Sequence, residues 1–321
     1  MGGPVTERSE RPPLDREYDE LVTSGNLVLL RTIRPTDVAQ LRQEFASPPI
    51  EQLIGDRPIR HEDFVVPESG MPVSVLTPVD AAIRGWVFAV HGGGLIVGDR
   101  YTGIEFVFDW IEQLGLAVVT PEYRLAPEHP YPAALTDCDH ALAWARAHFA
   151  ASGSSSLPLV LSGVSAGGAL ATALALTLRD RGEHALSALL LQAPMLDHRN
   201  ESVSSRQFSG TGQWDRESND TGWGAYLASS PTEVVTPYMS PALATDLTGL
   251  PPTFIDVGSA ELFRDEDVAF ASALWAAGVE AQLVVWPGGV HGFDRVAPAT
   301  TLARGARTVR NEWLARVIES A

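Results

Sequence analysis

Runs of apolar residues in this chain alternate with segments of helical periodicity. Residues 86–90 (WVFAV) form a continuous apolar run that begins after a glycine, and residues 116–120 (LAVVT) form another that is closed by Pro121. Such runs are typical of strands buried on both faces of a sheet. Between them, residues 101–114 carry apolar positions at helical spacing, which predicts a helix.

The same alternation continues through most of the chain. We expect further strands at 157–163, 187–193, 253–257 and 281–286, and further helices at 133–149, 166–181, 265–277 and 297–318. Strands that alternate with helices of this length require parallel crossover connections. The pattern therefore predicts an α/β fold, in which helices cover a parallel sheet.

The N-terminal part has a different pattern. Residues 36–47 are predicted to form a short amphipathic helix, and 58–67 with 71–78 a strand pair joined by a turn at 68–70. The first 20 residues are charged, contain prolines and lack the apolar core of a signal peptide, and we expect the first of them to be loose or to lie against the body. No apolar run reaches the roughly 18 residues of a membrane span. We therefore expect a cytoplasmic protein that does not insert into membranes.

One long segment, residues 195–250, interrupts the alternation. It is rich in Ser, Thr, Asp, Gly and Pro. A structureless loop of this length is implausible in a compact domain, so the segment predicts an inserted cap with short helices of its own. Its aromatic side chains either line a pocket or form a small core of the insertion; they are Phe208, Trp214, Trp223, Tyr226 and Tyr238.

Composition and charge exclude several classes of function. The chain has 321 residues, of which 45% are hydrophobic, and a formal net charge of −17. Such an acidic surface repels phosphate, so nucleic acids and anionic membranes are not expected as partners. The single cysteine, Cys138, allows no intramolecular disulfide, and the carboxylates beside it oppose a thiolate, so we expect a core residue. An H-E-x-x-H motif and a Cys/His cluster are absent, which argues against a metallohydrolase.

The pentapeptide at 163–167 (GVSAG) is the strongest single indication of chemistry. It is a G-x-S-x-G motif between a predicted buried strand and a predicted helix, with Gly163 and Gly167 on either side of Ser165. In that context the serine is held on a strained turn with its hydroxyl exposed at the end of the sheet. Glycines are expected beside it because a side chain would crowd the turn or the helix behind it.

A serine nucleophile needs a base and, behind the base, a carboxylate. His291 lies in a glycine-rich loop after the strand predicted at 281–286, which is a suitable position for the base. The acid is expected after the strand at 253–257, where Glu261 and Asp265 compete and Asp256 is a more distant alternative. Spacing favours Glu261, because Asp265 has the position of a helix N-cap and Asp256 lies within the strand.

The reaction also requires donors for an oxyanion. His91, Gly92, Gly93 and Gly94 directly follow the strand at 86–90, and consecutive glycines let backbone N–H groups turn toward a developing negative charge. We expect Gly93, Gly94 and the N–H of Ala166, next to the nucleophile, to be these donors. The His91 imidazole is expected to position the loop rather than to react.

These motifs together resemble the hormone-sensitive-lipase family of α/β-hydrolases. The resemblance covers about residues 60–300 and rests on HGGG at 91–94, YRLAPEHPYPAA at 123–134, GVSAG at 163–167, ELFRDE at 261–266 and HGF at 291–293, all in the order of the family. It implies an α/β-hydrolase fold, with a mostly parallel sheet of eight strands, helices on both faces and a helical cap. In the family the acid is usually an aspartate at the position of Glu261, and the segment at 123–132 is a structural element that buries Arg124 against carboxylates.

The resemblance also implies an organisation in three parts. Residues 1–55 contribute to the cap, 56–194 together with 251–321 form the catalytic domain, and 195–250 form the inserted cap segment. It implies carboxylesterase activity on short acyl chains without a cofactor or metal. The last strand and helix of such proteins often form a dimer, and residues 281–286 offer such an edge here.

The leading hypothesis is a serine carboxylesterase that acts on small ester substrates through an acyl-enzyme. Because the same triad serves all acyl transfer, a lactone or amide hydrolase is an alternative. A non-catalytic small-ligand receptor on the same fold is a further alternative, although such chains tend to lose the histidine that this chain retains at His291.

Overall fold

The computed structural model describes residues 10–29, 32–228 and 234–320. Eight strands form one sheet in the order β1-β2-β4-β3-β5-β6-β7-β8. The pairs β1/β2 and β2/β4 are antiparallel, and every later pair is parallel. The predicted α/β-hydrolase architecture, with a mostly parallel eight-stranded sheet, is therefore confirmed. Its strands are Ile59–Val65 (β1), Pro72–Pro78 (β2), Gly85–Val90 (β3), Leu116–Pro121 (β4), Leu159–Val164 (β5), Ala188–Gln192 (β6), Thr253–Gly258 (β7) and Ala281–Trp286 (β8).

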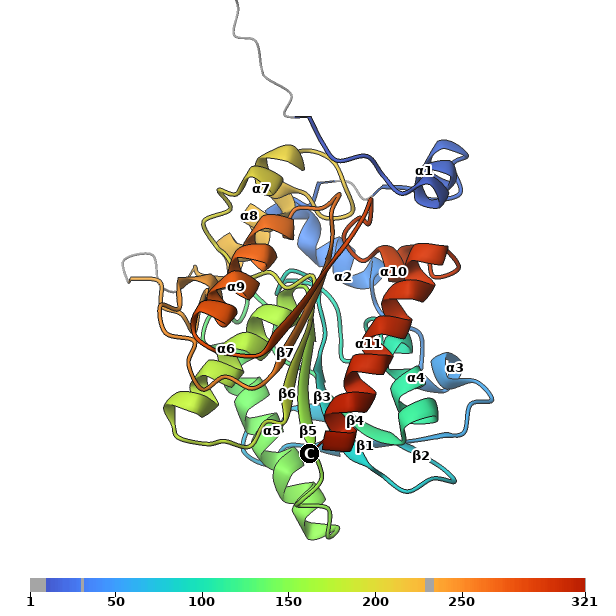
Figure 1. Ribbon diagram of the computed structural model, residues 1–321, viewed down its shortest axis with the longest axis vertical. Coiled ribbons are helices and arrows are strands. Elements are labelled where there is room, and N and C mark those ends of the chain that lie inside the picture. Colours follow the sequence, from blue (N-terminus) through green and yellow to red (C-terminus); the bar gives the residue numbers. More distant parts are fainter. Residues whose placement is uncertain (1–9, 30–31, 229–233, 321) are drawn as a thin grey trace, which may run out of the picture.

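Helices cover both faces of this sheet (Figure 1). One face packs on α5 (Ala133–Ala151), α6 (Ala166–Asp180) and α9 (Arg264–Ala276), and the other on α4 (Glu105–Leu114) and α11 (Thr301–Ser320). Successive side chains of a strand point to opposite faces, so Trp86 and Phe88 of β3 lie in the first core and Val87 lies in the second. This is why the continuous apolar runs in the sequence mark the central strands. Cys138 is fully buried in the first core, as expected.

The ends of several predicted helices differ from the structure. The helix expected at 101–114 begins only at Glu105, and the one expected at 36–47 is the 3₁₀ turn Pro35–Asp37 (η1) followed by α2 (Val38–Glu44). The final helix begins at Thr301 rather than 297, after a separate short helix, α10 (Phe293–Val296). Pro298 lies between α10 and α11 and cannot supply a backbone donor there.

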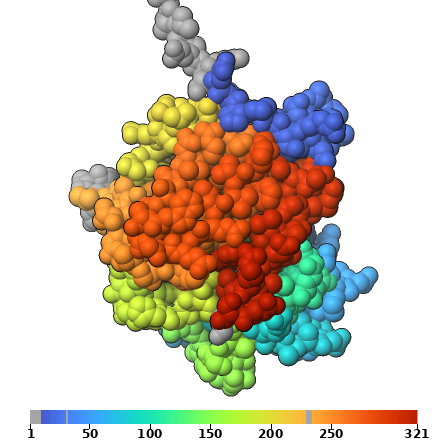
Figure 2. Space-filling model, in the orientation of Figure 1, coloured from blue at the N-terminus to red at the C-terminus, as the bar shows by residue number. Residues whose placement is uncertain are grey.

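The remaining short helices gather at one end of the molecule (Figure 1). They are α1 (Arg16–Thr23), α2, α7 (Val203–Gln207) and α8 (Arg216–Tyr226); elsewhere lie α3 (Ile50–Ile54) and the 3₁₀ turn Pro241–Leu243 (η2). Figure 2 shows the N-terminal segment in blue and the insertion in yellow at this end. Direct contacts join the two: Ile33 N–H donates to Ser218 Oγ at 2.8 Å, and Gln213 Nε2 donates to the Tyr18 hydroxyl at 2.8 Å. The expectation for residues 1–9 lies outside the described residues.

The aromatic residues of the insertion do not form a core of their own. Phe208, Trp223 and Tyr226 are buried within the first core of the main domain, so the insertion is packed directly on that domain. Trp214 belongs to the same core and also lines a cavity. Of the two alternatives posed by the sequence, a separate core of the insertion is therefore wrong, and the lining of a pocket holds for Trp214.

Two positions in the polar interior correct the sequence analysis. Arg124 pairs with Asp137 at 2.8 Å, but its own side chain is 48% exposed, so only the carboxylate is buried. Asp265 is not an N-cap: Phe263 is the N-cap residue of α9, and Asp265 lies in the first turn of that helix. Among the described residues, none of the helices is long and apolar enough to cross a membrane.

Several buried charged side chains lie on or beside β7, in α9, α10 and α11. Arg310 of α11 donates to Asp256 at 2.8 Å and also to Asp294, so one guanidinium serves two buried carboxylates. Two neighbouring carboxyls of α9, Glu266 and Asp267, are also buried, and burial raises the pKa of each well above its usual value. Glu266 accepts backbone N–H groups of the loop after β6, whereas both oxygens of Asp267 lack a partner within the described structure.

Helix α6 starts in very close contact with the end of β3. A Cβ at Gly167 would lie 2.1 Å from the carbonyl oxygen of Val90 and 2.4 Å from that of His91. Only a glycine allows two backbones to approach this closely.

The contact at Gly167 predicts a large loss of stability in Gly167→Ala. Backbone atoms cannot move aside as a flexible side chain does, so we expect a loss of about 3 kcal/mol or more in the free energy of unfolding. Gly224→Ala is the matched control, because Gly224 is also helical and has nothing within 4 Å of an added Cβ. We expect that variant to gain about 0.5–1 kcal/mol. Urea unfolding measures both, and equal stability of the two variants would contradict the argument.

The raised pKa of Asp267 predicts how stability depends on pH. The folded chain keeps a proton on Asp267 that the unfolded chain releases above about pH 4. The contribution of Asp267 to the free energy of unfolding is therefore largest at low pH. It decreases as the pH rises toward the folded-state pKa, by up to about 1.4 kcal/mol per pH unit. Asp267→Asn is expected to make the decline between pH 5 and pH 8 less steep.

Asp246→Asn is the control for this measurement. Hydrogen bonds from Thr248 lower the pKa of the exposed Asp246, so its contribution changes only at more acidic pH. Its replacement should leave the slope between pH 5 and pH 8 unchanged in urea titrations. An unchanged slope in Asp267→Asn would show that Asp267 is ionised in the folded protein.

Candidate active site

Ser165 lies on the tight turn between β5 and α6, where the sequence analysis expected it. Its φ angle is +55°, in a region that non-glycine residues rarely adopt. Backbone hydrogen bonds hold the turn: Ser165 N–H donates to the carbonyl of Gln192 at 2.9 Å, and the Ser165 carbonyl accepts from Met195 N–H at 3.0 Å. A Cβ at Gly163 would lie 2.2 Å from the carbonyl oxygen of Gly167, so the glycines on both sides of Ser165 are required by space.

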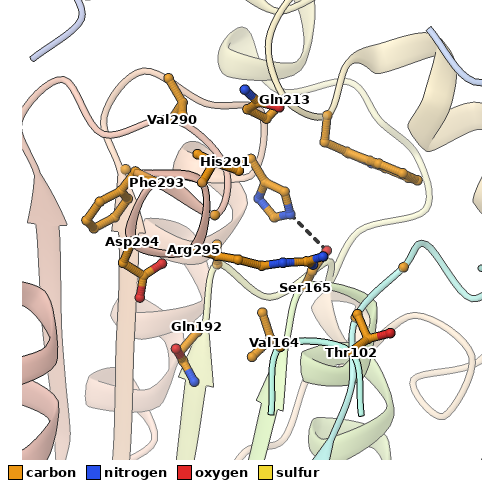
Figure 3. Close-up of a pocket in the computed structure, with 18 of the residues that line it drawn as sticks. Thr102, Val164, Ser165, Gln192, Gln213, Val290, His291, Phe293, Asp294 and Arg295 are labelled. Carbon is orange, nitrogen blue, oxygen red and sulfur yellow. Dashed lines mark hydrogen bonds between the residues drawn. The ribbon is translucent and has the colours of Figure 1, made fainter. Parts of the chain in front are cut away.

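His291 connects Ser165 to Glu261 through hydrogen bonds. Its Nε2 lies 3.0 Å from Ser165 Oγ (Figure 3), and its Nδ1 lies 3.1 Å from Glu261 Oε2. Glu261 is 2% exposed, and the same oxygen accepts the N–H of Phe263 at 3.2 Å. The Phe263 ring packs edge-on against the imidazole, with the ring centroids 5.1 Å apart. The three side chains come from the loops after β5, β7 and β8 and meet beyond the carboxyl ends of these parallel strands.

The two other candidate acids do not contact His291. Asp265 accepts from Ser204 N–H at 2.7 Å and from Arg264 Nε at 2.7 Å, which ties it to α7 of the insertion. Asp256 lies within β7 and accepts from Trp286 Nε1 at 2.9 Å as well as from Arg310. Of the three, the structure brings only Glu261 to the histidine.

The glycines of the HGGG segment lie next to the serine. A Cβ at Gly92 would be 3.2 Å from Ser165 Cβ, and Gly93 and Gly94 have φ angles of +116° and +61°. Ala166 is the first residue of α6, so helix geometry leaves its N–H without an internal acceptor. Within residues 10–29, 32–228 and 234–320, the N–H groups of Gly93, Gly94 and Ala166 form no hydrogen bond. They remain available to a ligand.

His91 supports this loop through contacts with Tyr123 and Gly92. The Tyr123 ring stacks on the His91 ring with centroids 4.1 Å apart, and the Tyr123 hydroxyl donates to the His91 carbonyl at 2.9 Å. Burial lowers the pKa of His91, so the ring is neutral at pH 7. His91 Nδ1 lies 2.7 Å from the carbonyl oxygen of Gly92 and donates to it as the neutral ring's N–H.

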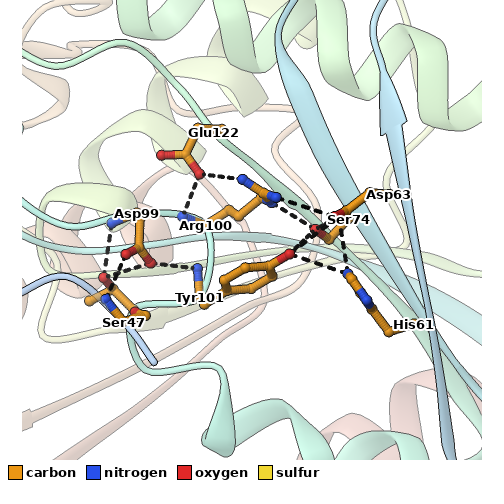
Figure 4. A network of polar contacts seen from close by, with 9 residues as sticks. Ser47, His61, Asp63, Ser74, Asp99, Arg100, Tyr101 and Glu122 are labelled. Carbon is orange, nitrogen blue, oxygen red and sulfur yellow. Dashed lines mark hydrogen bonds and ion pairs between the residues drawn. The ribbon is translucent and has the colours of Figure 1, made fainter. Parts of the chain in front are cut away.

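A polar network holds the chain that follows the HGGG segment (Figure 4). Asp99 accepts the N–H groups of Ser47 at 2.8 Å and Tyr101 at 2.9 Å. Arg100 then donates to Glu122 at 3.0 Å and to Ser74 at 2.8 Å. The loop is thus fastened to the N-terminal segment on one side and to β2 on the other.

A cavity of about 260 Å³ opens above Ser165 (Figure 3). Its lining is largely apolar and includes Val97, Phe106, Val164 and Trp214, with His291 and the HGGG glycines beside them. Pockets for drug-sized ligands occupy about 300–1,000 Å³, so this cavity suits a smaller molecule. No group of three or more His, Cys, Asp or Glu side chains in the described part of the chain is arranged to hold a metal ion.

The sequence analysis missed the contact between the insertion and the HGGG segment. A Cβ at Gly94 would lie 2.3 Å from the Trp214 ring, and a Cβ at Gly222 would lie 2.6 Å from the Gly94 carbonyl oxygen. Gly222 could have indicated this contact, because a glycine in the middle of a helical stretch often marks a place where two backbones pack closely. The analysis also did not single out Arg295, which follows His291 by four residues and lines the cavity.

Known proteins share both this sequence pattern and this fold. Carboxylesterase NlhH of Mycobacterium tuberculosis is 33% identical over 221 residues, which cover 67% of this chain and 69% of that protein. Lipase 2 of Moraxella sp. (strain TA144) is 33% identical over 230 residues, covering 63% of this chain and 53% of that one. The chain thus spans only about half the length of some of its curated relatives. Among solved structures, a bacterial heroin esterase superimposes with a TM-score of 0.85 at 30% identity and covers 95% of this chain and 98% of its own.

The family assignment follows from these similarities and from the site. The sequence profile of a family described by the alpha/beta hydrolase fold matches residues 87–295, which is more than half of the chain. The matched region carries the HGGG segment, Ser165, Glu261 and His291. The resemblance to hormone-sensitive-lipase-like carboxylesterases is confirmed, and this chain belongs to the α/β-hydrolase family.

Proposed function

We propose that this protein is a serine carboxylesterase that hydrolyses esters of short to medium acyl chains. The observation that carries the proposal is the continuous hydrogen-bonded series Ser165–His291–Glu261 at the base of an apolar cavity. This geometry meets the requirement that nucleophile, base and orienting acid lie within hydrogen-bond reach of one another. Relatives named carboxylesterase and esterase support the same activity.

In the proposed mechanism, Ser165 Oγ attacks the ester carbonyl carbon while His291 Nε2 takes the hydroxyl proton. Glu261 accepts from Nδ1, keeps the imidazole in the tautomer that leaves Nε2 free, and stabilises the imidazolium that forms. The imidazolium then protonates the leaving alcohol. Water, deprotonated by the same nitrogen, cleaves the acyl-enzyme and releases the acid.

The N–H groups of Gly93, Gly94 and Ala166 are proposed to bind the oxyanion of each tetrahedral intermediate. One such donor is worth about 3 kcal/mol of transition-state stabilisation. Because these groups have no partner within the described chain, they need not break a hydrogen bond before they receive the charge. Gly163, Gly167, Gly92 and His91 support the geometry without touching the reacting atoms.

Three further assignments remain proposals. The N-terminal segment to residue 55 and residues 195–250 are proposed to act together as a cap on the catalytic domain, as the contacts between Ile33 and Ser218 support. A homodimer through β8 is supported by the position of that strand at the edge of the sheet, where Val285 is 36% exposed. A location in the cytoplasm is proposed on the sequence analysis alone.

The proposed nucleophile is tested by Ser165→Ala. We expect turnover of p-nitrophenyl acetate and butyrate to fall by about 10⁵-fold or more, because no other hydroxyl replaces the nucleophile. Thermal unfolding confirms that the variant is folded, and labelling of the wild type by a fluorophosphonate with 1:1 stoichiometry is the positive control. Turnover that survives the substitution would rule out this mechanism.

The proposed acid is tested by comparing Glu261→Gln with Asp265→Asn. Without the Glu261 carboxylate, the imidazole of His291 is no longer held in the tautomer that leaves Nε2 free to accept a proton. We therefore expect Glu261→Gln to lower kcat by about 10⁴-fold. Asp265→Asn leaves the histidine contact intact, so its kcat should stay within about tenfold of the wild type. If Asp265→Asn had the larger effect, the acid would be wrongly assigned.

A further inference from the structure

Arg295 projects into the cavity from the same loop as His291. It belongs to α10, four residues beyond the histidine, and both residues line the cavity together with Ser165. Figure 3 shows its side chain among those of His291, Ser165 and Val164, which line the same cavity. The Arg295 side chain is exposed and forms part of the wall of this cavity.

The other charged side chains of the cavity wall, apart from the histidine, are paired with one another, and with both carboxylates ionised their formal charges leave a net negative charge. They are Asp256, Asp294 and Arg310, in which the guanidinium donates to both carboxylates. Burial raises the pKa of Asp256, which brings this group closer to neutrality. Neither carboxylate forms an ion pair with Arg295.

Arg295 itself has no side-chain hydrogen bond or ion pair within the described parts of the chain. It also borders an outer hollow lined by Glu44 and Glu105, and neither of these carboxylates pairs with it. Other exposed arginines, such as Arg60 on β1, likewise lack a partner, but Arg60 does not line this cavity. What distinguishes Arg295 is that its exposed and unpaired charge lies on the wall of the cavity that also contains Ser165 and His291.

From this geometry we infer that Arg295 binds a carboxylate of the substrate, so the preferred esters carry a carboxylate on either their acyl or their alcohol part. The inference rests on the proposed esterase function and specifies its substrate class. A guanidinium stays charged at any working pH and presents paired donors that match a carboxylate.

The inference is tested with matched esters that differ only in charge. Monoethyl adipate and ethyl adipamate place a carboxylate or a neutral amide on the acyl part; 4-butyryloxybutanoate and its amide do so on the alcohol part. The measured quantity is the ratio of kcat/KM for the carboxylate ester to that for the amide. A hydrogen-bonded ion pair is worth about 1.5–3 kcal/mol, so Arg295→Gln should lower this ratio roughly 10- to 100-fold in one of the two series.

Two further variants define the controls. Arg60→Gln removes the same charge from the surface of β1 and should leave both ratios at the wild-type value. Arg295→Lys keeps the charge without the paired donors and should give an intermediate ratio, and it replaces Arg295→Gln if that variant does not fold. Ratios that are the same in the wild type and the Arg295 variants, in both series, would overturn the inference.

A binding measurement separates this inference from the proposed function. Ser165→Ala and the double variant Ser165→Ala/Arg295→Gln are titrated with the same esters by calorimetry, which requires no turnover. A preference for the carboxylate ester that disappears in the double variant supports the inference even if the wild type cleaves none of the esters. Equal affinity for carboxylate and amide in Ser165→Ala overturns the inference, while turnover by the wild type would leave the esterase proposal intact.

Discussion

The turn that carries Ser165 is pressed onto the end of β3 so closely that no side chain fits between them. Gly167 rests against the carbonyls of Val90 and His91, and Gly92 rests against Ser165. The turn that carries Ser165 and the HGGG segment follow different strands, but these contacts pack them directly against each other. The positions of the free N–H groups relative to the serine hydroxyl follow from this contact, and so does the place where a reacting carbonyl has room to bind.

The acid side of the site depends on a second set of contacts. Glu266, five residues beyond Glu261, accepts two backbone N–H groups from the loop after β6, and the Ser204 hydroxyl of α7 donates to the Leu262 carbonyl at 2.6 Å. The loop after β6 and helix α7 of the insertion thus hold the segment that carries Glu261. These contacts accommodate a glutamate in place of the usual aspartate. Its Oε2 accepts hydrogen bonds from both the imidazole Nδ1 and the Phe263 N–H.

Much of this arrangement could be predicted from the sequence because it depends on local pattern. Central strands such as β3 and β4 are apolar on both faces, so their limits were predicted to within one residue. Ser165 and His291 were recognisable from turn chemistry and order along the chain. Contacts between segments that are distant in the sequence could not be predicted. They include the packing of Trp214 and Gly222 against Gly94 and the position of Arg295 on the cavity wall, which depend on how the insertion and the last loops fold back. Spacing favoured Glu261 over Asp265, but what occupies Asp265, its hydrogen bond from Ser204, could not be predicted.

The N-terminal segment contacts the loop that carries His291. Asp15 N–H donates to the Gly288 carbonyl at 3.0 Å, and a Cβ at Gly288 would lie 2.0 Å from the Asp15 nitrogen. Nearly the whole chain separates these two residues. During translation, which adds roughly 5–20 residues per second, the segment with Asp15 is made long before Gly288 and must wait for that loop before it can dock. The loop that carries His291 therefore gains its contact with the N-terminal segment only after every strand of the sheet has been synthesised.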